Sequence, residues 1–245
     1  MSTQIEKRES KALSTSTNLQ SWGQHEFTKK EFMVPRLTPT QATSEKAKSG
    51  EAKYGEIRDN LRNKCYGDLK TPMDVVPIYA SRRWESYEVT GVGTNVSRKY
   101  LADKSGPITP ENEDLPYREE VTQISYIERN RVIDVFMLVS GEKIPFVMSF
   151  KKTGLAIGKQ IITQMHMLNA AEGKVPPAYH VILQPVPKAS DNGEYIGLSF
   201  KMGGPSTPEE IAEAFKWYQS ITSGAAKAAE DEIVGEEIPG GPVPF

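Results

Sequence analysis

The hydrophobic periodicity of the chain changes from strand-like to helix-like near residue 153, and this change most constrains the fold. Upstream, Val, Ile, Tyr and Phe partly alternate with polar residues, which is typical of strands. From residue 153 to 171 the apolar residues recur on one face with helical spacing. The sequence predicts strands over 73–90, 121–139, 144–150, 178–186 and 194–202, and helices over 153–171 and 206–221.

Two local motifs support this order. Asp191-Asn192-Gly193 joins the last two predicted strands and favours a hairpin turn. Thr207, Pro208 and Glu210 begin the last helix with a capping residue, a proline at the first helical position and the second half of a capping box. The C-terminal helix should therefore begin at or next to Pro208.

The predicted order places one helix between strands and a second helix at the end of the domain. An OB-fold, a five-stranded Greek-key barrel, has its helix between the third and fourth strands. We therefore predict an α+β, mainly β fold: an OB-fold-like five-stranded barrel with a helix between strands and a C-terminal helix, flanked by disordered arms. Another α+β sheet domain would give the same order of elements.

Composition divides the chain into three parts. Residues 1–30 are polar and aperiodic and predict a flexible N-terminal arm. Residues 31–222 predict a single OB-like nucleic-acid-binding domain, with a long Pro- and Gly-broken loop at 91–118. Residues 223–245 predict a disordered acidic C-terminal tail.

Several protein classes do not match the sequence. The apolar run 132–139 is interrupted by Asp134 and is too short to span a bilayer, and the N-terminus has no signal-peptide core. The single Cys65 fits a reducing compartment, so we expect a cytoplasmic protein, in the host cytoplasm if it is phage-encoded. The three histidines do not have metal-site spacing, and fragments that resemble nucleotide-binding loops are incomplete. We therefore predict no enzyme activity, no metal and no cofactor.

Charge is distributed unevenly along the chain. Residues 206–245 hold eight acids and two bases, a net −6, whereas residues 1–205 hold 28 bases and 24 acids, a net +4. A basic body with an acidic end is typical of proteins whose body meets a polyanion.

Cations and aromatic residues are interleaved at four places, the pattern that single-stranded nucleic acid requires for backbone contacts and base stacking. The predicted nucleic-acid-binding residues are Arg82, Arg83, Trp84, Tyr87, Arg98, Lys99, Tyr100, Arg129, Arg131, Lys151 and Lys152. Trp84 is the preferred stacking residue, because Arg83 and Glu85 beside it indicate a polar face. The alternative for each cluster, and the more common arrangement, is a buried aromatic residue next to solvated cations.

The acidic tail ends in Pro244-Phe245, after Glu236, Glu237 and a Gly-Gly-Pro-Val spacer. This end resembles the tails of bacterial single-stranded-DNA-binding proteins and of their phage-encoded counterparts. The resemblance covers about the last sixteen residues and implies that Phe245 and its carboxylate dock on partner proteins while the acids steer the approach. A solubilising end with a chance terminal Phe is the alternative.

The body, in which "VPRLTPTQATSEKAKSGEAKYGEIRDN" leads into "MDVVPIYASRRW", resembles other phage proteins, among them the single-stranded-DNA-binding proteins of N4-like phages. We therefore expect sequence-tolerant binding of single-stranded DNA in phage replication or transcription. The expected partners are single-stranded DNA and, through the tail, replication or transcription proteins, with no membrane; homo-oligomerisation stays open. The alternative is a phage structural or adaptor protein whose polar arms order on assembly.

Overall fold

The computed structural model of the 245-residue chain describes residues 32–92, 95–172, 176–190, 193–224 and 226–228. The predicted arm at 1–30 and most of the predicted tail at 223–245 lie outside these residues. The elements are β1 (Phe32–Val34), β2 (Arg36–Pro39), α2 (Glu45–Lys48), β3 (Ile57–Asp59), β4 (Cys65–Gly67), β5 (Met73–Val92), β6 (Asn95–Tyr100), η1 (Ala102–Lys104), β7 (Gly106–Pro107), β8 (Arg118–Thr122), β9 (Ser125–Val139), β10 (Pro145–Lys151), η2 (Lys152–Gly154), α3 (Leu155–Glu172), η3 (Pro176–Ala178), β11 (Tyr179–Ser190), β12 (Gly193–Pro205), α4 (Pro208–Thr222) and β13 (Ala226–Ala228).

Strands dominate the described residues and form one large mixed sheet in the order β12-β11-β5-β9-β10-β2-β3-β4. β6 and β7 pair with β5, and β8 pairs with β9. The β10–β2 pair is parallel, whereas the other pairs of this sheet are antiparallel. A small separate sheet joins β1 to β13. The mainly β class, the helix between strands and the C-terminal helix are confirmed.

The structure does not have the predicted five-stranded barrel. Its large sheet is open and has 11 strands among the described residues. A side chain just beyond β2 nevertheless reaches the edge strand β12. The side-chain amide of Gln41, beyond β2, donates to the carbonyl oxygen of Ile196 at 3.0 Å and accepts from the Ile196 N–H at 2.8 Å. The Gln41 amide hydrogen-bonds to β12 as a neighbouring strand would, but β2 and β12 do not pair with each other. The OB-like barrel is therefore not confirmed.

The sheet buries a different apolar cluster on each face. On one face, residues such as Ile133, Met148 and Leu183 pack against Ile161 of α3. On the other, Val76, Phe136 and Val147 pack against Ala214 and Ile221 of α4. Because side chains alternate along β9, its odd-numbered residues from Ile133 to Val139 supply the first cluster and Phe136 and Leu138 the second.

The start of α4 is fixed as the sequence predicts. Thr207 caps the helix, because its side chain accepts from the backbone N–H of Glu210. The Glu210 side chain accepts in return from the backbone N–H of Thr207, which completes a capping box. Glu210 also contacts Nε2 of His180 at 3.1 Å, while Nδ1 of His180 contacts Asp74 at 2.8 Å. Burial disfavours the charged imidazole, but these two carboxylates outweigh it and raise the pKa of His180. His180 therefore ties α4 to β5 and β11.

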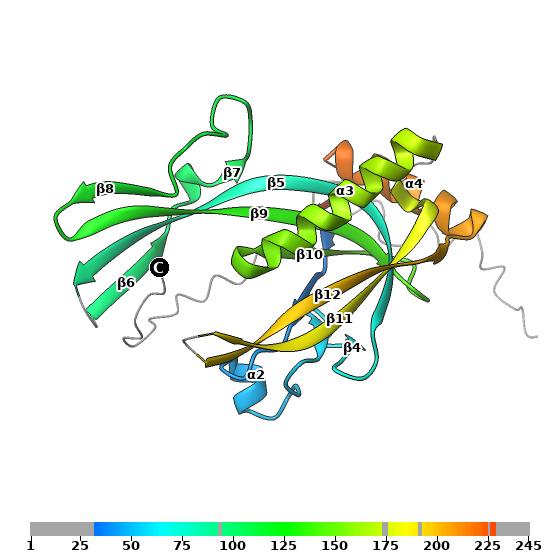
Figure 1. Cartoon of the computed structure of the whole chain (residues 1–245), viewed down its shortest axis with the longest axis horizontal. Coiled ribbons are helices and arrows are strands. Elements are labelled where there is room, and N and C mark those ends of the chain that lie inside the picture. The colour runs from blue at the N-terminus through cyan, green and yellow to red at the C-terminus, as the bar shows by residue number, and fades with distance from the viewer. Residues whose placement is uncertain (1–31, 93–94, 173–175, 191–192, 225, 229–245) are drawn as a thin grey trace, which may run out of the picture.

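β5 and β9 continue past the core as a long antiparallel ribbon, with β6, β7 and β8 along its edges (Figure 1). The predicted loop at 91–118 lies here and contains β6, η1 and β7. β6 pairs with β5 from Tyr100 opposite Tyr87 to Asn95 opposite Val92. Pairing along the exposed edge of β5 makes Asn95–Tyr100 a strand despite its polar composition.

Candidate nucleic-acid interface

One face of the ribbon carries a continuous row of charged side chains, which we call the charged stripe. Arg83 and Glu85 on β5 share this face with Glu128 and Asp134 on β9, because residues two apart in a strand point to the same side. β10 contributes Lys151 opposite Val132 of β9, and β6 contributes Arg98. The members of the charged stripe are Arg36, Arg83, Glu85, Arg98, Glu128, Asp134, Lys151 and Lys152.

The end of the charged stripe near the core is a buried ion-pair cluster centred on Asp134. Its carboxylate accepts from Nε of Arg83 at 2.7 Å and from Nη1 of Arg36 at 3.3 Å, and it also accepts from the hydroxyl of Ser149. The side chains of Arg36 and Asp134 are only 7% and 6% exposed. Charges this far from water need such partners, so the cluster fixes β2, β5, β9 and β10 against one another.

Glu85 occupies the middle of the charged stripe and is shared by three donors. Arg83 lies 2.9 Å from its carboxylate, Lys151 lies 3.3 Å away, and the hydroxyl of Tyr87 donates to it at 3.3 Å. Burial disfavours the charged guanidinium of Arg83, but Asp134 and Glu85 outweigh it and raise the pKa of Arg83 still further. Lys151 keeps 44% of its side chain exposed and can reach a ligand from this position.

Glu128 organises the outer end of the charged stripe. It accepts from Arg98 at 2.6 Å, from the side chain of Asn130 at 3.0 Å and from the hydroxyl of Tyr117 at 3.4 Å. Burial, followed by the charge of Glu128, raises the pKa of Tyr117. Partial loss of water around its ammonium group, together with the charges of Arg98 and Lys151, lowers the pKa of Lys152.

Aromatic rings flank the same outer end. Tyr87 and Tyr100 meet edge to face, with ring centroids 5.6 Å apart, and the guanidinium of Arg98 lies 4.8 Å from the Tyr87 centroid. Arg118 lies 3.8 Å from the ring centroid of Tyr126. All three tyrosines are half-buried, so each ring is fixed by packing and still has an accessible part. Fixed rings between cations are what bases and phosphates of a single strand require.

Other predicted residues lie on the opposite face of the ribbon, away from the charged stripe. Trp84 is only 3% exposed, its indole N–H donates to the carbonyl of Asn112 at 3.0 Å, and Arg131 lies 5.1 Å from its ring. Arg82 pairs with Glu113 at 2.8 Å, and Arg131 donates to the Glu113 carbonyl at 2.6 Å. The segment between β7 and β8 therefore covers Trp84, which has no exposed face for stacking.

Arg129 and Lys99 also lie apart from the charged stripe. Arg129 is 5% exposed and donates to the Pro116 carbonyl at 3.2 Å and to Glu119. Lys99 is exposed and follows Arg98 in β6, so it points to the other side of the ribbon. Of the predicted residues, the structure brings together Arg83, Tyr87, Arg98, Tyr100, Lys151 and Lys152.

The carboxylates that hold these cations are not among the predicted site residues. Glu85 and Arg83 are two apart in a strand, a spacing that could have indicated one shared face. Glu128 and Asp134 come from a distant part of the sequence, and strand register alone brings them to the site. The predicted tail residues Glu236, Glu237, Pro244 and Phe245 lie outside the described residues.

The described residues contain neither a candidate metal site nor a helix that could span a membrane. No group of three or more His, Cys, Asp or Glu side chains is placed to hold a metal ion in this part of the chain. Among the helices of the same residues, none is long and apolar enough to cross a membrane.

Comparison with known proteins identifies a phage family. The family model described as Pam3 phage gp34-like protein matches residues 5–227, so the chain belongs to that family. No curated protein and no solved structure matches the chain. The match supports the expected phage origin.

Proposed function

We propose that this member of the Pam3 phage gp34-like family binds single-stranded DNA with little sequence preference along the charged stripe, in phage replication or transcription. The observation that carries the proposal is the cluster of Tyr87, Arg98 and Tyr100 beside Lys151 and Lys152. The Tyr87 ring contacts both Tyr100 and Arg98, and Lys151 shares the carboxylate of Glu85 with the Tyr87 hydroxyl. Stacking on an aromatic ring contributes about 1–3 kcal/mol per base.

The contact surface that we propose is smaller than the predicted set of residues. Tyr100 and Tyr87 are the stacking residues in this proposal, and Lys151, Lys152 and Arg98 contact phosphates. Trp84 and Arg129 support the ribbon from its other face. A DNA strand would contact Arg82, Lys99 and Arg131 only if it passed around the edge of the ribbon.

The test measures the anisotropy of a labelled oligo-dT across several salt concentrations. We expect Tyr100→Ala to lower affinity by about 5–150-fold, the equivalent of one lost stacking contact, and Tyr100→Phe to retain it. Lys151→Gln should lower affinity and make the salt slope about 0.7 shallower, whereas Lys99→Gln on the other face should change neither. If the wild-type protein does not bind oligo-dT at 50 mM salt, the proposal is wrong.

For the acidic tail we propose recruitment of replication or transcription proteins, or self-regulation through competition with DNA. Removal of the residues after Glu237 should leave or raise the affinity for DNA while it weakens a pull-down of the partner. Loss of DNA binding on truncation would contradict this role. Phe245→Ala in the full chain separates docking of the aromatic ring from steering by the acids.

A structural or adaptor role is favoured by one separate observation. Next to the turn between β8 and β9, Val121 and Ile124 are 51% and 55% exposed. Exposed apolar side chains that lie together are typical of protein contact sites. A Val121→Ser/Ile124→Ser variant should lose incorporation into phage particles if this role is correct, and should retain oligo-dT binding.

A further inference from the structure

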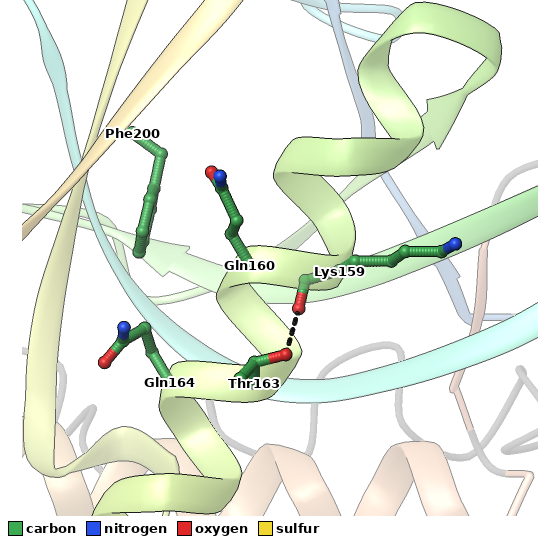
Figure 2. A pocket seen from close by; sticks show the side chains of 5 residues that line it. All are labelled: Lys159, Gln160, Thr163, Gln164 and Phe200. Carbon is green, nitrogen blue, oxygen red and sulfur yellow. Dashed lines mark hydrogen bonds between the residues drawn. The ribbon is translucent and has the colours of Figure 1, made fainter.

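A depression between α3 and β12 lies outside the charged stripe (Figure 2). It has a volume of about 450 Å³ and is lined by Lys159, Gln160, Thr163, Gln164 and Phe200. Sites for small molecules in proteins usually measure about 300–1,000 Å³. This depression is more open than such sites, so a planar ring would lie against Phe200 without being enclosed.

The lining combines one aromatic ring with two primary amides. Figure 2 shows the side chains of Gln160 and Gln164 directed from α3 towards the ring of Phe200, with Lys159 pointing away. The hydroxyl of Thr163 donates to the Lys159 carbonyl within the helix at 2.9 Å, so it does not compete for a ligand. In the described part of the chain, neither glutamine amide makes a hydrogen bond with a protein group.

We propose that this depression binds one unstacked nucleobase of the same single strand, with Phe200 as the stacking surface and the two glutamine amides on the edge of the base. The ring is partly buried against the core cluster around Leu183 and Leu198, so its orientation is fixed before a ligand arrives. Each amide has both donors and an acceptor, and can therefore pair with the edge of any base. The inference rests on the proposed DNA binding.

The depression is connected to the charged stripe through the chain itself. Lys151 and Lys152 of the stripe are followed by Gly154 and then by α3. Gln160 lies five residues into α3, about 7.5 Å along its axis from Leu155. α3 covers the face of the sheet opposite the charged stripe, so a strand that leaves Lys152 must pass around the end of β10 to reach Phe200.

The test combines photocrosslinking with matched variants. A 20-nucleotide oligo-dT substituted with 5-iododeoxyuridine should crosslink to the peptide that contains Phe200. Phe200→Leu keeps an apolar side chain against the core but removes the aromatic face, and should lower affinity for the 20-mer at least about fivefold. Gln160→Glu/Gln164→Glu should also lower affinity, whereas Gln219→Glu, an exposed position on α4, is the control for added charge. Circular dichroism checks that each variant is folded.

The outcomes separate this inference from the proposed function. Absence of oligo-dT binding by the wild-type protein contradicts the proposed function. If the wild type binds and Tyr100→Ala weakens binding, but Phe200→Leu and the double glutamate variant bind normally and no crosslink forms at Phe200, the nucleobase site is wrong while the charged stripe stands.

Discussion

Asp134→Ala should be among the most destabilising single substitutions on the ribbon. The carboxylate lies between Arg83 and Arg36 and also accepts from Ser149, with only 6% of its side chain exposed. Its removal leaves two guanidinium groups facing each other without the charge that separates them. Breaking a buried ion pair by deletion of one partner costs about 3–5 kcal/mol. Domains of this size are stable by about 5–15 kcal/mol, so the loss takes a large fraction of the total.

Urea unfolding followed by circular dichroism measures this effect. With a slope of about 2 kcal/mol/M, the midpoint should fall by about 1.5–2.5 M. Asp134→Asn keeps the shape and a hydrogen-bond acceptor and should lie between Asp134→Ala and the wild type. Glu113→Gln breaks the exposed pair with Arg82 and should change stability by less than about 1 kcal/mol. Equal midpoints for Asp134→Ala and Glu113→Gln would show that the buried cluster does not hold the strands together.

Three further predictions concern the helices. The raised pKa of His180 makes its bonds to Glu210 and the opposing carboxylate most stabilising below about pH 6.5, and this stabilisation is lost as pH rises through the folded-state pKa. Urea unfolding should therefore show a lower midpoint above that pKa for the wild type but little change for His180→Gln. A Cβ at Gly158 would lie 2.9 Å from the Cβ of Phe150, so Gly158→Ala should lower the free energy of unfolding by about 1–3 kcal/mol in urea titrations. Thr207→Ala removes the cap of α4 and should cost about 1 kcal/mol in the same assay.

Local motifs predicted the helices and one hairpin, because their determinants lie within a few residues. The cap of α4 at Thr207 and the antiparallel pairing of β11 with β12 up to Ser190 and Gly193 are of this kind. The strand at Asn95–Tyr100 and the open sheet were not predictable in this way. Both depend on which distant strand each segment pairs with, and that information is spread over the whole chain.

Trp84 shows why flanking residues mislead in a strand. Arg83 and Glu85 beside it are polar, and this polarity predicts an exposed ring. In a strand, however, neighbours in sequence point to the opposite face, so their polarity describes the charged stripe and not the environment of the indole. Trp84 itself lies under the segment that carries Asn112, a contact that no local pattern encodes.

The carboxylates of the charged stripe reduce the salt dependence that we expect for the affinity for DNA. The stripe holds five cations, Arg36, Arg83, Arg98, Lys151 and Lys152, and three acids, Glu85, Glu128 and Asp134, a net charge of 5 − 3 = +2. A phosphate that approaches Lys151 or Arg98 exchanges with a carboxylate that is already in place, and releases fewer condensed counterions than a bare cation would. With a slope of about −0.7 per neutralised phosphate on single strands, independent contacts by Lys151, Lys152 and Arg98 would give about −2.1, whereas retention of Glu85 and Glu128 beside them would give about −0.7. A shallow salt dependence with retained Tyr100 sensitivity would therefore indicate binding by exchange on the charged stripe, and a slope steeper than about −2.1 would place additional phosphates on cations elsewhere in the chain.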